Sequence, residues 1–232
     1  MFLVPPDLGR RNGPNRRTVI RGALLLALVP GIVLWLAIAG FGLLLSGPLT
    51  GWARSESDLN RSLQGARGLT WDTVTSLWSR LGNTEIIIGV CLVVIVVLWW
   101  RTRRWWFAVI PAIAISLQAT IFVTVSTVIG RARPDVPHLD PAPPTSSYPS
   151  GHVGASVALY TSFAIMATEI KRTWLRRIVI GVCLVIPFLV GYARLYRGMH
   201  HLSDVVVGAV NGLVCAGLAA RCLLHNAPRR NQ

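Results

Sequence analysis

The stretch 194–204 carries the residues in this chain that are best suited to chemistry. It reads Arg-Leu-Tyr-Arg-Gly-Met-His-His-Leu-Ser-Asp and lies between two strongly apolar runs. Ionisable groups at the edge of a membrane span are costly, so a functional role is the default hypothesis. His200 and Asp204 are four residues apart, so on a helix they share one face, where a carboxylate can orient an imidazole ring. His201 would lie about 100° away around the helix, and we assign it to packing.

A second cluster, Pro-Ser-Gly-His at 149–152, opens another apolar run. Proline disfavours helix at the residue before it, and Ser150 is a favourable N-cap. The free N–H groups of a helix start bind anions, and Gly151 lets another group approach the backbone closely. The cluster therefore predicts an anion site at Ser150 and Gly151, beside His152. The alternative is an ordinary helix cap with an interfacial histidine.

Arginines complete the set of candidate residues. Arg131 and Arg133 precede Pro134 at the mouth of one apolar run, and Arg194 ends another. The planar guanidinium group suits bidentate capture of phosphate, although an arginine at a membrane edge can also be a simple anchor. Two histidines, a carboxylate and several arginines together suit chemistry on a phosphoryl group, which needs a nucleophile, an acid and charge neutralisation.

The composition places these residues in a membrane protein. Of 232 residues, 53% are hydrophobic and only 14% are charged, and the mean hydropathy is +0.54. The net charge of +14 is dispersed among the loops, which argues against a nucleic-acid partner. The four cysteines lie in or at the ends of apolar runs and show no metal-ligand spacing, so we predict no metal and no other cofactor.

Six apolar runs predict an all-α, polytopic fold, namely a bundle of six transmembrane helices in one domain. The runs cover approximately residues 19–46, 84–100, 105–129, 150–170, 178–193 and 200–224.

The remaining segments are tails and loops. Residues 1–18 and 226–232 are basic tails flanking the membrane domain, 19–225. Within 51–82, apolar residues recur at helical spacing. This pattern predicts a short amphipathic segment, which lies in the headgroup region or packs on the bundle itself.

The distribution of charge predicts the orientation in the membrane. Six spans put both termini on one side, which carries 15 Lys/Arg and two acids, against eight Arg and seven acids on the other. By the positive-inside rule, both termini are cytoplasmic, and the candidate site faces the extracytoplasmic side of the plasma membrane. The single lysine among so many arginines hints at a bacterial source.

At these residues the chain resembles the type 2 phosphatidic acid phosphatase family of integral membrane lipid phosphatases. The family signature reads Lys-x6-Arg-Pro, then Pro-Ser-Gly-His, then Ser-Arg-x5-His-x3-Asp. The second part matches completely, and Arg133-Pro134, Arg194, His200 and Asp204 keep the spacing of the others. Ser126 stands at the position of the lysine and Ala193 at that of the first serine.

The resemblance implies a role for each matching residue. His200 would attack phosphorus and become a phosphohistidine, while Asp204 holds its ring. His152 would protonate the leaving lipid oxygen and then activate water. Arg133 and Arg194, with the N–H groups near Ser150 and Gly151, would hold the phosphate oxygens. Arg131 or Arg197 could substitute for the missing lysine.

The resulting hypothesis is a metal-independent phosphatase acting on a lipid phosphate or diphosphate in the bilayer. Polyprenyl diphosphate, phosphatidylglycerophosphate and phosphatidic acid are the substrate types considered. Two alternatives stay open. One is a phosphotransferase that passes the group to an acceptor lipid, and the other, prompted by Ser126, is a catalytically impaired binder of lipid phosphates.

Overall fold

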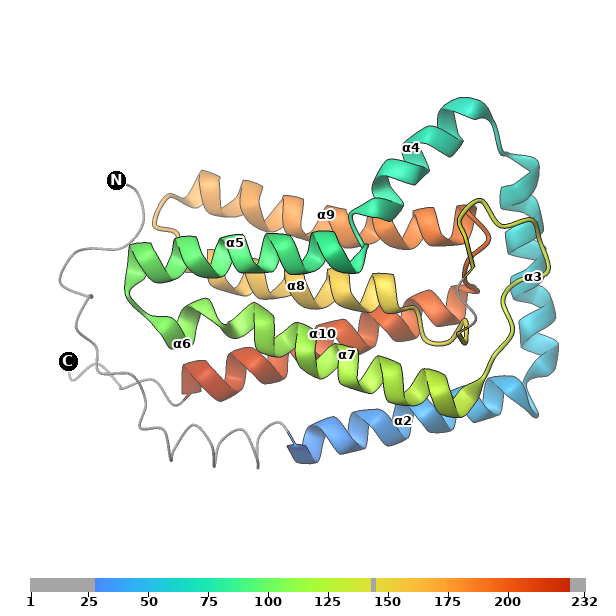
Figure 1. Cartoon of the computed structure of the whole chain (residues 1–232), viewed down its shortest axis with the longest axis horizontal. Helices are drawn as coiled ribbons and strands as arrows, with labels where there is room; N and C mark the ends of the chain where they lie inside the picture. The colour runs from blue at the N-terminus through green and yellow to red at the C-terminus, as the bar shows by residue number, and fades with distance from the viewer. Residues whose placement is uncertain (1–27, 143–144, 226–232) are drawn as a thin grey trace.

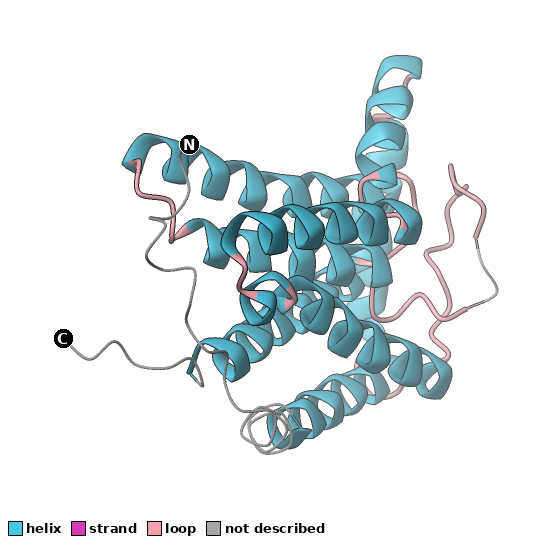
Figure 2. Ribbon diagram, turned by 60° about the vertical axis from the view of Figure 1, so that its left-hand side comes forward, coloured by secondary structure: helices cyan, strands magenta, loops and turns pink. Residues whose placement is uncertain are grey.

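The computed structural model describes residues 28–142 and 145–225, and within these ranges the chain forms helices and loops (Figure 2). The helices are α2 (Val29–Ser46), α3 (Thr50–Gly65), α4 (Leu69–Arg80), α5 (Thr84–Thr102), α6 (Trp105–Ala108), α7 (Ile110–Ile129), α8 (Gly151–Ala167), α9 (Thr173–Tyr196) and α10 (Leu202–His225).

Among the described residues, five helices are long and apolar enough to cross a membrane, namely α2, α5, α7, α9 and α10. The apolar α8 has 17 residues and lies in the middle of the bundle (Figure 1). The chain is therefore a multi-pass membrane protein, as predicted. The start of the first predicted span (19–27) and both predicted tails lie outside the described residues, so the count of six spans stays a prediction.

Prolines account for two features of the helices. The predicted span 105–129 is broken into α6 and α7 at Val109, two residues before Pro111. Proline is favoured in the first turn because it lacks the N–H that would go unpaired there. Pro187 lies inside α9, where a membrane helix tolerates it because neighbouring groups satisfy the freed backbone.

The stretch 51–82 forms two helices instead of one. α3 lies across one end of the bundle and α4 rises obliquely beside α9 (Figure 1). On α4, Trp71 and Leu77 are at least half exposed, while Trp78 packs edge-on against Tyr192 of α9, with ring centroids 6.2 Å apart. Part of the apolar stripe therefore packs on the bundle, and a position in the headgroup region stays a prediction.

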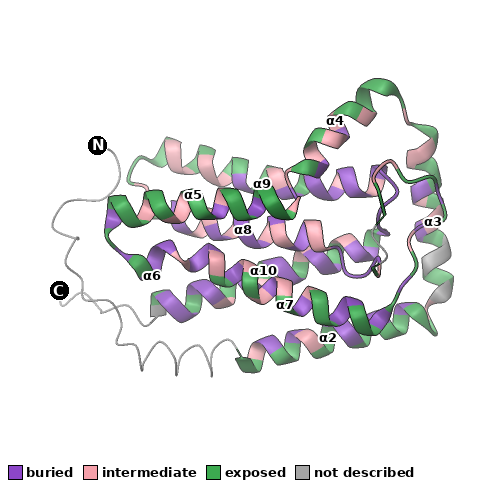
Figure 3. Ribbon diagram, in the orientation of Figure 1, coloured by how far each residue is buried: buried purple, intermediate pink, exposed green. Residues whose placement is uncertain are grey.

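The centre of the bundle is the contact between α8 and α10. A Cβ atom at Gly208 of α10 would lie 2.5 Å from the carbonyl oxygen of Ser150, and one at Gly212 would overlap the backbone of α8 at Gly154. Small residues allow such close packing of membrane helices. Figure 3 shows α8 and α10 rich in buried residues, whereas α5 is largely exposed, as expected for a helix that faces lipid.

The polar connections gather at one end of the bundle. α3, α4, the loop 130–150 and the turn between α9 and α10 lie together there, opposite the α5–α6 turn and the end of α10 (Figure 1). The charge distribution predicts that this end is extracytoplasmic, and that orientation stays a prediction. The fold thus brings the three sequence motifs to a common place.

Candidate active site

A cavity of about 480 Å³ at this end is lined by residues of all three motifs. Arg133 comes from the loop after α7, Gly151 and His152 from the start of α8, Arg194 from the last turn of α9, and His200 from the α9–α10 turn. Segments up to 67 residues apart along the chain therefore supply one site.

His200 lies before α10, whereas the sequence suggested that it starts this helix. α9 ends at Tyr196, Gly198 adopts a positive φ of 73°, and α10 begins at Leu202. Glycine takes this left-handed conformation without steric cost. His200 is therefore held by a tight turn and not by a helix.

The ring of His200 is oriented by a backbone carbonyl. Its Nδ1 atom lies 2.7 Å from the carbonyl oxygen of Ser147. A carbonyl can only accept, so Nδ1 carries the proton and Nε2 keeps its lone pair. Burial, together with the charges of Arg194 and Arg133, lowers the pKa of His200 well below its usual value. The ring is thus neutral and has a free nitrogen, as a nucleophile requires.

Asp204 contacts His200 less directly than its spacing suggested. Its Oδ2 atom lies 3.9 Å from Nδ1 of His200 and instead accepts hydrogen bonds from the Ser147 hydroxyl (2.6 Å) and the His201 N–H (2.8 Å). Its Oδ1 atom accepts from Arg131 at 2.6 Å. A carboxylate at the third helical position commonly bonds the backbone N–H just before the helix. Because α10 begins two residues later than His200, Asp204 makes this capping bond and holds His200 through Ser147.

The two arginines in the cavity are anchored through one nitrogen each. Nη1 of Arg133 donates to the Met199 carbonyl (2.7 Å), and Nη1 of Arg194 donates to Asp140 and Ser79 (both 2.9 Å). The Nε atoms of both arginines are buried without a protein partner. Both arginines line the cavity, so they bring positive charge to the end of it where an anion such as phosphate would bind.

Asp140 clamps the arginines from the loop before α8. It accepts hydrogen bonds from Arg194 at 2.9 Å and from Arg197 at 2.7 Å. Burial alone would raise the pKa of Asp140, but the Arg197 hydrogen bond and the charges of both arginines hold it below the usual value. The ionised carboxylate therefore keeps Arg194 beside the cavity.

Ser150 and Gly151 have different roles in the structure. The Ser150 N–H donates to the Asp204 carbonyl at 2.9 Å, and its side chain makes no capping hydrogen bond although it stands at the cap position. It packs against α10 near Gly208. Only Gly151 lines the cavity, so the predicted anion site at Ser150 needs correction: its N–H is already used to join α8 to α10.

His152 has a partner that the sequence did not reveal. Its Nε2 atom lies 3.2 Å from Oδ1 of Asn83, the residue just before α5. Asparagine before an apolar run could have been recognised as a helix cap. Its contact with His152 arises only when α5 packs beside α8.

Neither candidate for the missing cation lines the cavity. Arg197 donates to Asp140 and to the Asp72 carbonyl, and Arg131 is paired with Asp204 and Glu56. These bonds direct both guanidinium groups to other carboxylates, so the geometry does not support either residue as a replacement for the lysine at position 126.

The other end of the cavity is apolar and reaches the outer surface of the helices. Ile87 and Ile88 line it from α5, and Phe122 and Val123 line it from α7. Ile88 is 48% exposed and Val123 is 53% exposed, on helices that are apolar enough to span a membrane. The cavity therefore joins a cationic, histidine-bearing end to an apolar wall that continues to the exposed surface of α5 and α7.

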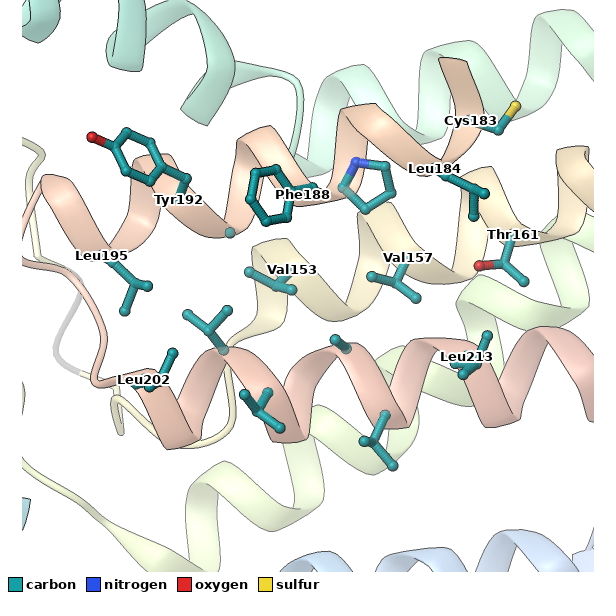
Figure 4. Close-up of a pocket in the computed structure, with 16 residues that line it drawn as sticks. Val153, Val157, Thr161, Cys183, Leu184, Phe188, Tyr192, Leu195, Leu202 and Leu213 are labelled. Carbon is teal, nitrogen blue, oxygen red and sulfur yellow. The ribbon is translucent and has the colours of Figure 1, made fainter. Parts of the chain in front are cut away.

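A second cavity of about 570 Å³ lies between α8, α9 and α10 (Figure 4). Its lining is mainly aliphatic and aromatic, with Val157, Phe188 and Leu213 among the labelled residues. Apart from Thr161, Cys183 and Tyr192 it is apolar, and it includes no histidine, arginine or carboxylate of the described chain. The chemistry therefore belongs to the first cavity.

Comparison with known proteins identifies the family and the fold. The sequence pattern of the PAP2 superfamily matches residues 105–228. A search of curated protein sequences finds no match. Two solved structures share the fold. The first is a transmembrane PAP2-type phosphatidylglycerolphosphate phosphatase from Bacillus subtilis (TM-score 0.74, 19% identity, covering 85% of this chain and 98% of that one). The second is LpxE from Aquifex aeolicus (TM-score 0.58, 22% identity, 71% and 93%).

Proposed function

Because the chain belongs to the PAP2 superfamily, we propose that it is a membrane phosphatase that hydrolyses a lipid phosphate or diphosphate through a phosphohistidine. One observation carries the proposal. A single cavity places His200, His152, Arg133 and Arg194 at one end of an apolar wall formed by helices that are apolar enough to span a membrane. A soluble phosphate ester would have no use for that wall.

The reaction proceeds in two steps. In the first, Nε2 of His200 forms a bond to phosphorus, the bond from phosphorus to the lipid oxygen breaks, and His152 gives a proton to that oxygen. In the second, His152 takes a proton from water, the water oxygen bonds to phosphorus, and the N–P bond breaks to release phosphate. A group that acts as an acid in one direction acts as a base in the other.

The arginines supply the positive charge for both steps. The guanidinium groups of Arg133 and Arg194 and the backbone near Gly151 stabilise the equatorial oxygens of the phosphoryl group. Preorganised donors of this kind usually contribute more to the catalysis of phosphoryl transfer than any other single effect. The charge comes from guanidinium groups, so we expect turnover without an added metal.

The apolar wall supports a lipid substrate with its tail between α5 and α7. The headgroup chemistry admits polyprenyl diphosphate, phosphatidylglycerophosphate and phosphatidic acid. The charge distribution supports a site on the extracytoplasmic face of the plasma membrane, with both termini in the cytoplasm.

The test is phosphate release from a panel of these lipids in detergent, in the presence of a chelator. We expect His200→Ala to lose activity by several orders of magnitude, while His138→Ala, at an exposed histidine of the loop, keeps it. An unchanged rate for His200→Ala would contradict the mechanism. Transfer to an added acceptor lipid instead of water would identify a phosphotransferase, and vanadate binding without any turnover would identify a binder.

A further inference from the structure

The helix α3 buries a polar face against the catalytic turn. Glu56 and Asn60, four residues apart and therefore on one side of the helix, are only 4% and 1% exposed. A buried carboxylate is costly unless it is paired. The partners of these two residues therefore show what α3 does.

Glu56 makes three short hydrogen bonds inside the protein. Its Oε2 atom accepts from Nη2 of Arg131 at 2.9 Å and from the Ser203 hydroxyl at 2.9 Å. Its Oε1 atom accepts from the Ser203 N–H at 2.6 Å. Glu56 thus binds the first turn of α10 and the guanidinium group of Arg131 together.

Arg131 links this carboxylate to the catalytic residues by two routes. Its Nη1 atom donates to Oδ1 of Asp204 at 2.6 Å, and its backbone carbonyl accepts from the Ser147 N–H at 2.8 Å. Ser147 in turn donates its hydroxyl to Asp204, and its carbonyl accepts from His200. Both routes end at the carbonyl that orients the His200 ring.

Asn60 adds a third link from the same face of α3. Its Nδ2 atom donates to the carbonyl of His200 at 3.2 Å and to that of Leu195 at 3.3 Å. The turn that carries His200 is therefore held from α3 on its backbone as well as through the ion pair.

We propose that Glu56 and Arg131 are positioning residues for phosphoryl transfer, with their buried ion pair holding Asp204 and Ser147 so that His200 presents Nε2 to phosphorus. This inference rests on the proposed role of His200 as the nucleophile. It makes α3, a polar helix outside the predicted spans, part of the catalytic apparatus.

The first experiment compares two isosteric substitutions on α3. Glu56→Gln keeps the shape and removes the charge, and Asp58→Asn does the same at a side chain that is 74% exposed. We expect Glu56→Gln to lower kcat by about 10-fold or more with KM within about 3-fold, because positioning acts on the transition state. Asp58→Asn should match the wild type. If α3 were docked only for stability, Glu56→Gln would lower the midpoint of thermal unfolding and leave kcat of the folded protein unchanged. That result would overturn the proposal.

A double substitution tests whether the pair acts as a unit. We expect Glu56→Gln combined with Arg131→Gln to lower kcat no further than Arg131→Gln alone, since linked residues are not additive. Arg131→Lys, which keeps a charge but cannot bridge two carboxylates equally well, should recover part of the loss. Independent, multiplying effects would count against the proposal. If Glu56→Gln does not fold, Arg131→Lys carries the same comparison of kcat with KM.

A readout that does not need turnover separates this inference from the proposed function. Nitrogen-15 histidine NMR in detergent, with His200 assigned by its loss in His200→Asn, reports which ring nitrogen carries the proton. We expect the Nδ1–H form in the wild type and in Asp58→Asn, and a mixture in Glu56→Gln. If the wild type releases no phosphate but Glu56→Gln shifts this signal, the proposed function fails, while the control of the His200 ring by Glu56 stands. An unshifted signal together with an unchanged kcat would refute the positioning role.

Discussion

Nδ1 of His200 lies 2.7 Å from the carbonyl oxygen of Ser147, and this contact determines which nitrogen can attack phosphorus. Asp204, whose Oδ2 atom is 3.9 Å from the same nitrogen, acts on Ser147 through the hydroxyl group. The carboxylate therefore supports the group that orients the histidine. Asp204 also pairs with the buried Arg131, so removing its charge would disturb that ion pair as well as the orientation of the His200 ring.

Ser147→Ala keeps the backbone acceptor and removes one hydrogen bond to Asp204. A hydrogen bond to a charged group contributes about 1.5–3 kcal/mol. Since the carboxylate keeps its bonds to Arg131 and the His201 N–H, we expect kcat to fall by about 10-fold, the lower end of that range. Asp204→Asn breaks a buried ion pair and should cost far more, about 100-fold or greater. Steady-state phosphate release measures both, with Ser62→Ala at an exposed serine of α3 as the control. Equal effects of the two substitutions would contradict an indirect role for the carboxylate.

His201 predicts how stability depends on pH. Burial and the charge of Arg131 lower the pKa of His201 to about 4, against about 6.5 in an unfolded chain. Below pH 6.5 the unfolded chain therefore binds more protons than the folded one. The free energy of unfolding is therefore at its full value above pH 6.5 and falls as the pH drops toward 4. The decrease that His201 causes is about 2 kcal/mol at pH 5.

Thermal unfolding in detergent at pH 7 and pH 5 checks this prediction. His201→Gln should reduce the difference between the two midpoints, whereas His138→Gln, at an exposed position, should leave it as in the wild type. A difference that survives in His201→Gln would assign the acid sensitivity to other groups.

Ser126 is the position at which the family signature has lysine. Its side chain is 8% exposed and donates to the Val123 carbonyl, and it follows Phe122 by four residues on the face of α7 that lines the cavity. A lysine there would extend along that wall. We expect Ser126→Lys to raise kcat/KM by about 10-fold through a lower KM, because it adds one cation near the phosphate.

Ser126→Met is the matched control for this substitution, since it adds similar length without charge. An equal gain from both would show that packing, not charge, limits the enzyme. No gain from Ser126→Lys would show that the missing cation is not limiting.

The apolar wall predicts how chain length affects turnover. Ile88→Trp adds bulk where the cavity reaches the outer surface of α5, and Leu92→Trp adds the same bulk one turn away, outside the lining. We expect Ile88→Trp to raise KM for a long-chain lipid phosphate by about 10-fold and to spare a short-chain ester. Leu92→Trp should affect neither. If Ile88→Trp raises KM equally for the long-chain and the short-chain substrate, the lipid tail does not pass between α5 and α7.

The local pattern of the sequence was enough to predict the apolar helices and to identify the family. In lipid the backbone N–H and C=O groups of a long apolar run must be paired within the protein, and a helix pairs them within the run itself. The spacing of Pro149 to His152 and of Arg194 to Asp204 is a property of the chain itself. Counting the predicted spans also places the three motifs at the same end of the bundle.

Only the tertiary structure could decide how those residues are held. The partners of His200, His152 and Arg131 are Ser147, Asn83 and Glu56, between 53 and 75 residues away along the chain. A hydrogen bond requires its two atoms to lie about 3 Å apart, and for such distant residues that separation depends on how whole helices pack. The four-residue spacing of His200 and Asp204 predicted a direct contact on one helix face, but His200 lies before α10 and its connection to Asp204 is indirect. Its route through Ser147 depends on where α10 begins and on what α3 and the loop before α8 bring to it.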